Sequence, residues 1–254
     1  MTEENTEIDC VLRPMNCEIN LLSKSDGSAV FMQGETTIIA GVNGPMEARS
    51  QKMAYDKLSI EVAYTPLKGP AKIDDRLIET YLRETCESAI LVSMHPNTMV
   101  CINLQEMQDF GGLLACAINA SCLALINSGL SMKYTIAAVS CMIEKETGKV
   151  IIDPDSTQLK NAKAEFTYAF DSINKDIVCC HSVGRFSQNE FIASMDKCKQ
   201  DTMLDPSGEM IAQERRREGR REEILPGAPV ARCLPADLSP FPYARGTRTR
   251  LFHF

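Results

Sequence analysis

The longest apolar stretch of this chain, residues 111–126, restricts its fold more than any other feature. Asn119 and Ser121 interrupt the stretch, and it is shorter than the ~20 apolar residues that a helix needs to span a bilayer. A helix that is apolar on all its faces and does not enter a membrane has to be buried in a protein core. We therefore expect a soluble protein whose core contains this helix, which Gly129 ends.

The segments on the two sides of this helix occur in a repeated order. Residue patterns before it predict strands at 17–22, 29–32, 36–42 and 59–64, a helix that starts at Asp74 and is stopped by Pro96 and Asn97, and a strand at 98–104. Patterns after it predict strands at 134–143, 150–152, 165–170 and 177–183, and a last helix that Ser187 and Glu190 cap. This order predicts an α+β protein made of two similar halves around one core.

The charge of the chain is unevenly distributed. Apolar residues make up 44% and charged residues 24%, as in ordinary globular proteins. The net charge of −7 argues against a broad nucleic-acid-binding face, which would usually be basic. Residues 211–254 hold nine Arg, no Lys and five acidic residues, a net charge of +4, whereas residues 1–210 carry −11. We expect a flexible N-terminus at 1–11, one domain at 12–210, and an irregular, disordered tail at 211–254 with too few aliphatic residues to fold.

Cysteine and histidine are not spaced as in metal sites. The chain has eleven Cys but no CxxC pair, and only three His. The sequence therefore predicts neither a metal nor a cofactor. Several cysteines fall in apolar runs, which favours reduced, buried thiols in an intracellular protein; these are Cys101, Cys116, Cys122, Cys179 and Cys180. The acidic, polar start of the sequence resembles neither a secretory nor a mitochondrial signal.

The segment 105–117, QEMQDFGGLLACA, is the most informative for chemistry. A predicted strand runs into Asp109, two glycines follow, and the apolar helix begins. Glycines at such a turn let a backbone approach a ligand, and the N-terminus of a helix can hold a phosphate. Tight packing of the turn would require the same two glycines, so the segment alone leaves both interpretations open.

The order and spacing of several short pieces over residues 12–200 resemble the RNase PH family. These pieces are Arg13-Pro14, 25–29, 32–36, 42–45, 109–112, Asn119-Ala120 and Asp153-Pro154. The run LRETCESAIL at 82–91 is typical of the eukaryotic exosome ring subunits within that family. The resemblance implies an RNase PH-like α+β fold of two split β-α-β halves about a pseudo-twofold. It also implies a hexameric ring of such subunits around a central RNA channel.

Active members of the family phosphorolyse RNA from its 3′ end, and this sequence departs from them at the residues that do so. The Thr and Arg that bind phosphate align with Gly112 and Leu113, and the two Asp residues of metal-assisted transfer align with Leu159 and Glu165. A further phosphate-binding Arg falls near 72–76 without a unique alignment. Leu113 cannot pair with a phosphate, and one carboxylate is a poor magnesium site. The resemblance therefore implies a degenerate site with no catalytic residue.

Three other features have a chemical and a structural interpretation. Asp153 and Asp155 could form a carboxylate pair, but with Pro154 between them a turn is favoured. Residues 246–249, GTRT, repeat the letters of the family's phosphate motif, but no predicted strand precedes them and no helix follows. His181 has no predicted nucleophile beside it, which favours a packed or exposed histidine over a catalytic one.

Basic residues gather in predicted loops of the first half. They are Arg49, Lys52, Lys57, Lys68, Lys72 and Arg76, and of these Arg49, Lys52, Lys68, Lys72 and Arg76 are the candidates for RNA binding. Solvated loop cations would give the same pattern. In a ring subunit such residues can contact phosphates without reading bases, and the scarcity of aromatic residues argues against sequence-specific recognition.

The sequence thus leads to two hypotheses. The first is a non-catalytic exosome ring subunit that supports 3′-to-5′ RNA processing and decay, including rRNA processing and mRNA turnover. The resemblance then implies as partners other RNase PH-like subunits, small RNA-binding cap proteins, a separate catalytic exonuclease and RNA. It implies no contact with a membrane. It also implies a location in the nucleus and nucleolus and in the cytoplasm. The second is a divergent phosphorolytic RNase or nuclease that acts as a homodimer through Glu165. The Arg-rich run 215–221 fits a nuclear localisation signal or a charged helix.

Overall fold

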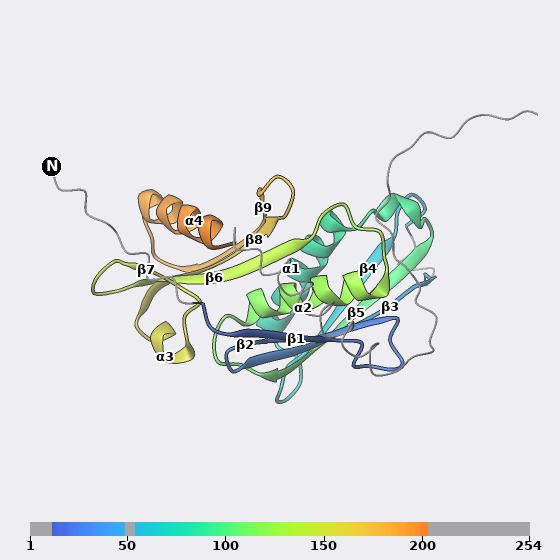
Figure 1. Cartoon of the computed structure of the whole chain (residues 1–254), viewed down its shortest axis with the longest axis horizontal. Coiled ribbons are helices and arrows are strands. Elements are labelled where there is room, and N and C mark those ends of the chain that lie inside the picture. Colours follow the sequence, from blue (N-terminus) through green and yellow to red (C-terminus); the bar gives the residue numbers. More distant parts are fainter. Residues whose placement is uncertain (1–11, 49–53, 203–254) are drawn as a thin grey trace, which may run out of the picture.

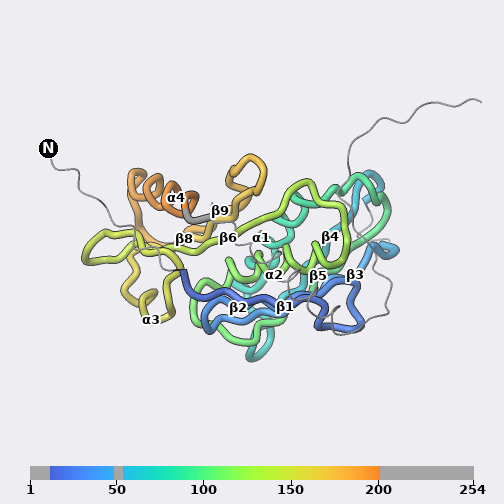
Figure 2. Tube along the Cα trace, in the orientation of Figure 1, coloured from blue at the N-terminus to red at the C-terminus, as the bar shows by residue number. Residues whose placement is uncertain are grey.

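The strands and helices of the protein stack in four layers in the computed structural model, which describes residues 12–48 and 54–202 (Figure 1). A five-stranded sheet forms the first layer, and helices α1 (Ile73–Ala89) and α2 (Leu113–Ser128) form the second. A four-stranded sheet forms the third, and helix α4 (Gln188–Thr202) covers its outer face. The path of the chain through these layers can be followed in Figure 2. The predicted α+β class with two halves around a common core is confirmed.

The five-stranded sheet has the strand order β1-β2-β3-β5-β4. Its strands are β1 (Met15–Ile19), β2 (Gly27–Gln33), β3 (Thr36–Glu47), β4 (Ser59–Thr65) and β5 (Thr98–Gln108). All neighbours are antiparallel except β4 and β5, which run parallel. A parallel pair needs a crossover, and α1 with the short 3-10 helix η1 (Val92–Met94) supplies it. This crossover places α1 against the sheet, beside α2.

The four-stranded sheet is antiparallel throughout, with the order β7-β6-β8-β9. Its strands are β6 (Ile136–Glu144), β7 (Val150–Ile152), β8 (Ala162–Asp171) and β9 (Ile177–Gly184), and a one-turn helix, α3 (Ser156–Leu159), joins β7 to β8. The predicted cap of the last helix is confirmed, because the Ser187 N–H donates to Glu190 Oε2 over 2.8 Å and the Glu190 N–H donates to Ser187 Oγ over 3.4 Å. These two bonds satisfy backbone donors at the start of α4.

Helix α2 is the buried centre of the molecule, as its sequence predicts. Every residue from Leu114 to Leu125 is buried, since the helix packs on β2 and β3 on one side and on β6 on the other. Asn119 is accommodated because its side chain donates to the carbonyl of Ala138 and accepts from the N–H of Ala138, at 3.0 and 2.8 Å. A Cβ at Gly27 would lie 2.4 Å from the Ala124 carbonyl oxygen, so glycine lets β2 approach the helix.

Several strands differ from their predicted bounds by a few residues, as β1 does at Met15–Ile19 instead of 17–22, and two helices differ in more than this. Helix α1 ends at Ala89, well before Pro96, because Ile90 is extended and forms a bridge with Met132, and the Leu91 N–H donates to the carbonyl of Ser131. Helix α3 was not predicted, since one turn is too short to give a periodic pattern. Gly129 does end α2, in the left-handed conformation at φ 73°.

The sequence predicts a flexible segment at 1–11, a domain at 12–210 and a disordered tail at 211–254. Residues 1–11 and 211–254 lie outside the part of the chain that the structure describes, so these two predictions stay predictions. No helix among the described residues is long and apolar enough to cross a membrane. The described cysteines are free thiols, and burial raises the pKa of Cys116 to about 12 and that of Cys122 to about 11. Cys101 and Cys179 are half-buried and Cys180 is exposed, so the prediction of burial is wrong for these three.

Candidate functional site

The turn between β5 and α2 lies where the two halves meet, and its two glycines are required by packing. Gly111 and Gly112 have φ of +106° and +69°. A Cβ at Gly111 would lie 2.7 Å from the Pro154 carbonyl oxygen. A Cβ at Gly112 would lie 2.8 Å from the hydroxyl of Ser140, which is buried and has no hydrogen-bond partner among the described residues. A Thr at position 112, as in active RNase PH proteins, would therefore have to displace that hydroxyl.

Arg13 fastens this turn to the second half of the molecule. Its guanidinium donates to the carbonyl of Phe110 over 3.4 Å and to that of Gly111 over 3.2 Å. The same guanidinium forms a two-pronged ion pair with Asp153, and the Arg13 backbone N–H donates to Asp153 Oδ2 over 3.0 Å. Asp153 is only 4% exposed. The cation nearest to the turn is thus already used to join segments that are 140 residues apart.

Asp153 and Asp155 do not form a paired metal site. Asp153 is already paired with Arg13. Asp155, which directly precedes α3, has a carboxylate that is 55% exposed and lies 3.4 Å from Arg13 Nη1. The structural interpretation of these two residues is therefore supported. No group of three or more His, Cys, Asp or Glu side chains among the described residues could hold a metal ion.

Leu113, the first residue of α2, separates two cavities. The first, which we call the Glu165 cavity, has a volume of about 330 Å³ and lies between α1, α2, β8 and β9. It is lined by Asp74, Leu77, Ile78, Tyr81, Leu113, Leu114, Glu165, Thr167, His181 and Val183. The structure thus brings Leu113 and Glu165 together, as their alignment with one active site predicts. Leu159, in α3, is half-buried and lines neither cavity.

The Glu165 cavity is electrostatically unsuited to phosphate. Burial and the nearby charge of Asp109 raise the pKa of Glu165, and burial lowers the pKa of His181, so the imidazole is neutral at pH 7. The His181 ring packs on Tyr81 with 5.0 Å between ring centroids, as expected for a packed histidine. No Lys or Arg among the described residues lines this cavity. A phosphate dianion would meet two carboxylates and no cation.

The second cavity, which we call the Lys72 cavity, has a volume of about 350 Å³ and lies between β4, β5 and the start of α1. Its lining includes Lys68 and Lys72 together with Asp75, Glu106 and Asp109. Glu106 is already occupied, since it accepts from the Tyr64 hydroxyl over 2.7 Å and from the Leu67 N–H over 3.3 Å. The side chains of Lys68 and Lys72 form no ion pair with any described residue and are exposed.

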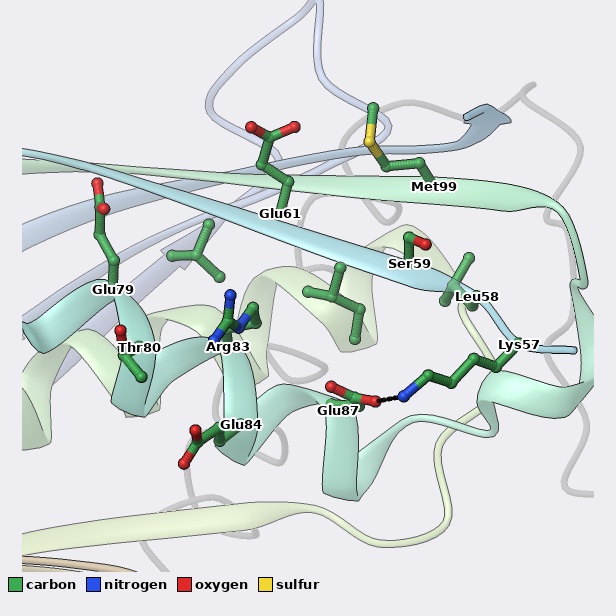
Figure 3. A pocket seen from close by; sticks show the side chains of 12 residues that line it. Lys57, Leu58, Ser59, Glu61, Glu79, Thr80, Arg83, Glu84, Glu87 and Met99 are labelled. Atoms are coloured by element: carbon green, nitrogen blue, oxygen red, sulfur yellow. Dashed lines mark hydrogen bonds and ion pairs between the residues drawn. The ribbon is translucent and has the colours of Figure 1, made fainter. Parts of the chain in front are cut away.

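The predicted basic candidates do not form one loop cluster. Lys72 directly precedes α1 and Arg76 lies within its first turns, so the prediction of loops is wrong for Arg76. Lys57 pairs with Glu87 across a third cavity, of about 550 Å³, between β4 and α1 (Figure 3). Glu61, Glu79, Arg83 and Glu84 also line that cavity (Figure 3). Arg49, Lys52 and the 246–249 segment lie outside the residues that the structure describes.

Two residues that matter at this place have no role in the prediction from the sequence. In the sequence, Arg13 appears only as part of the family pattern, because its partners are far away in the chain. A lone basic residue before the first strand is nevertheless a signal that could indicate an ion pair. Asp74 was noted only as an acidic residue at a helix start, and it lines the Glu165 cavity.

Known proteins share both the sequence pattern and the fold. Residues 11–131 match the family described as RNase PH, 3′ exoribonuclease family, domain 1. A rice protein named exosome complex exonuclease RRP46 homolog is 35% identical over 164 residues, which are 65% of this chain and 68% of the rice protein. Exosome complex component RRP46 of Saccharomyces cerevisiae is 27% identical over 73% of this chain and 91% of its own length. The crystal structure of rice Rrp46 matches with a TM-score of 0.71 and 29% identity, over 77% of this chain and 95% of the rice chain.

Proposed function

The chain belongs to the RNase PH family of 3′ exoribonucleases, and from this premise we propose that it is a non-catalytic ring subunit of an exosome. The observation that carries the proposal is the start of α2, where a leucine takes the place of the phosphate-binding arginine. Leu113 opens into a cavity whose described lining holds carboxylates and no cation. The names of the rice and yeast relatives, both exosome complex proteins, support the assembly.

The loss of phosphate binding follows from charge. A phosphate carries about two negative charges at neutral pH, and enclosing it without a cation leaves that charge uncompensated. Arg13 is close to the turn, but it is held by Asp153 and by the carbonyls of Phe110 and Gly111, so it is not free to bind an anion. Removing one such donor from an active site typically lowers the rate by about 10²–10³.

The loss of metal binding follows from ligand number. Magnesium prefers six oxygen ligands and is usually held by at least one or two carboxylates together with substrate oxygens. Here Leu159, which aligns with one of the two family acids, carries no carboxylate and lines neither cavity, and burial raises the pKa of the other, Glu165, which disfavours its charged form. Neither the nucleophile nor the leaving oxygen of a phosphorolytic step would be stabilised at this place.

In the ring we assign an RNA-guiding role to cations around the start of α1. Lys68, Lys72 and Arg76 are exposed and have no ion-pair partner among the described residues. Such cations bind the RNA backbone by releasing counterions and do not read sequence. Arg49 and Lys52 are further candidates from the sequence. The proposed partners are other RNase PH-like subunits, small RNA-binding cap proteins and a separate exonuclease, and the proposed locations are nucleus, nucleolus and cytoplasm.

One observation favours a second candidate function, a divergent nuclease that acts as a homodimer. Glu165 keeps a carboxylate with a raised pKa in a cavity, as general acids and bases often do, and the rice relative is named an exonuclease. Against it stands the described lining of that cavity, which holds no Lys or Arg and, besides Glu165, a single acid, Asp74.

Two measurements separate these functions. The purified protein is incubated with a 3′-unstructured RNA, phosphate and magnesium, and nucleoside diphosphate release is measured for the natural chain and for Leu113→Arg. We expect neither to exceed an enzyme-free control, because Leu159 still leaves the metal site incomplete. Release that disappears in Glu165→Gln would establish the nuclease instead. Co-expression with RNase PH-like subunits should give a mixed ring, and a stable monomer that binds none of them would contradict the assembly.

A further inference from the structure

The Glu165 cavity lacks a counter-charge. Neither Glu165 nor Asp74 makes a hydrogen bond or an ion pair through its side chain with any described residue, and His181 beside them is neutral at pH 7. A carboxylate that is half-buried and unpaired is costly, and Asp109 adds to this cost by raising the pKa of Glu165. The cavity is therefore complementary to a positively charged group.

The mouth of the cavity is also apolar. Leu77 is 46% exposed and Val183 is 53% exposed, and both line the cavity together with Leu113. Apolar surface left in water costs roughly 25 cal/mol per Å². An occupant that matches the whole cavity therefore has apolar side chains next to a cation, and no acid.

One segment of this chain has that composition. Residues 244–254, ARGTRTRLFHF, contain three arginines, Leu251 and two phenylalanines, and no acidic residue. The other Arg-rich segment, 214–223, fits worse, because its five arginines are accompanied by four glutamates and no apolar residue. Both segments lie outside the described residues, beyond the end of α4 at Thr202.

The chain between Thr202 and the segment is long enough to reach the cavity. About 43 residues separate Thr202 from Arg245. A flexible chain of that length has a root-mean-square span of roughly 36 Å, which is comparable to the dimensions of a domain of this size. Tethering then gives an effective concentration in the millimolar range, so even a weak site is occupied.

We propose that residues 244–254 of this chain dock in the Glu165 cavity, with arginines of the segment paired to Glu165 and Asp74 and with Leu251 and Phe252 packed against Leu77, Leu113 and Val183. The family's lost phosphate site thereby becomes a binding site for the protein's own tail. The docked segment covers the apolar mouth and supplies the missing positive charge. The proposal is independent of the ring assembly and of RNA binding.

Photo-crosslinking of the full chain tests this docking. Phe252 is replaced by benzoylphenylalanine, the protein is irradiated, and the linked residues are mapped by mass spectrometry. We expect links to peptides that contain Leu77, Leu113 or Val183. The matched probe is benzoylphenylalanine at Phe241, which lies in the same tail but outside the segment, and it should give few such links.

Charge-removing variants then show whether the proposed ion pairs hold the segment. The double variant Asp74→Asn, Glu165→Gln should lower the Phe252 link yield at least threefold, and so should Arg248→Gln, Arg250→Gln. Arg215→Gln, Arg216→Gln removes the same charge elsewhere in the tail and should leave the yield unchanged. Circular dichroism confirms that each variant is folded.

Three results would overturn the proposal. They are the absence of links to the cavity, links that persist at full yield in both carboxylate and arginine variants, and links that form only between copies. The last is detected by mixing isotopically light and heavy chains, and it would assign the cavity to a second copy.

Discussion

Two carboxylates of the second half, Asp153 and Glu165, both lie near the start of α2, but only one of them has a partner. Asp153 is buried and receives the Arg13 guanidinium and the Arg13 backbone N–H. Glu165 is half-buried and has no partner among the described residues. A charge that is satisfied inside the chain holds the fold together, whereas a charge left unsatisfied is available to something else. This difference separates residues that stabilise the fold from residues that are available for binding.

The largest expected effect is from Asp153→Ala, which leaves Arg13 without its partner. Breaking a buried ion pair from one side typically costs about 3–5 kcal/mol, so we expect the melting temperature to fall by roughly 10 °C. Thermal unfolding followed by circular dichroism measures it. Asp155→Ala is the control, since its carboxylate is 55% exposed and farther from Arg13, and should shift the midpoint by no more than about 3 °C. Equal losses of melting temperature in the two variants would contradict the distinction between a buried, paired Asp153 and an exposed Asp155.

The second prediction extends the comparison to cations. Lys68, Lys72 and Arg76 have no ion-pair partner among the described residues, whereas Lys57 is paired with Glu87. Replacing the first three by Ala should weaken RNA binding of the assembled ring about tenfold and make the salt slope shallower by about 2. Fluorescence anisotropy over a salt series measures both. Lys57→Ala should change neither, and an effect as large as that of the triple variant would contradict this division of the cations.

The third prediction concerns Glu165 in a chain that carries Arg248→Gln and Arg250→Gln. Burial and Asp109 raise the folded-state pKa of Glu165 above its unfolded value, so its charged form destabilises the fold at pH 7. This penalty disappears as the pH falls through the folded pKa and then below the unfolded one. Glu165→Gln should therefore raise the melting temperature by about 2 °C at pH 7, a gain that vanishes below about pH 4.

The same substitution with both tail arginines present should gain less, because the arginines then pair with the carboxylate. Asp74, Asp109 and His181 also face this region, and they are unchanged in both backgrounds, so the difference between the two backgrounds reports the arginines alone. An identical gain in both would count against the docked tail while leaving the ring assignment untouched.

The smallest expected effect is from removing the tail. Truncation after Ile211 deletes a segment with few aliphatic residues, and a docked stretch held by partly exposed ion pairs contributes about 1 kcal/mol. We expect the melting temperature to change by less than about 3 °C in differential scanning calorimetry. A loss of 5 °C or more would show that residues beyond 211 belong to the folded domain.

Local chemistry was enough to predict much of the fold. Strand β7 was predicted at its observed bounds because branched apolar residues follow a turn, and α2 and the Ser187–Glu190 cap were predicted from composition and spacing. The end of α1 was not, because it is set by the bridge between Ile90 and Met132, more than forty residues apart. No local pattern contains that pairing.

The sequence predicts which residues meet at the candidate site, but it does not predict that the cavity there is apolar and acidic. Alignment with the family placed Gly112, Leu113 and Glu165 at one site, and the structure brings Leu113 and Glu165 to one cavity. That this cavity is apolar and acidic depends on Asp74, Leu77 and Val183, which come from other elements. Leu159 was placed in the same site, yet α3 carries it away from both cavities that Leu113 lines.

The pairing of Asn119 with Ala138 has a consequence for assembly. Strand β7 accompanies β6 only along residues 141–143, and the earlier part of that edge is completed by other groups. The Ser140 carbonyl accepts from the Asp153 N–H, Ala138 is matched by the Asn119 amide, and the Ile136 N–H donates to Cys122 Sγ. A central helix thus acts as a substitute neighbouring strand and closes this edge of the sheet to other chains. The edge strands of this sheet are β7, which has three residues, and β9, so another protein that extends the sheet pairs with one of these two strands. The inward amide of one buried residue thereby keeps a ring neighbour from pairing with the first part of β6.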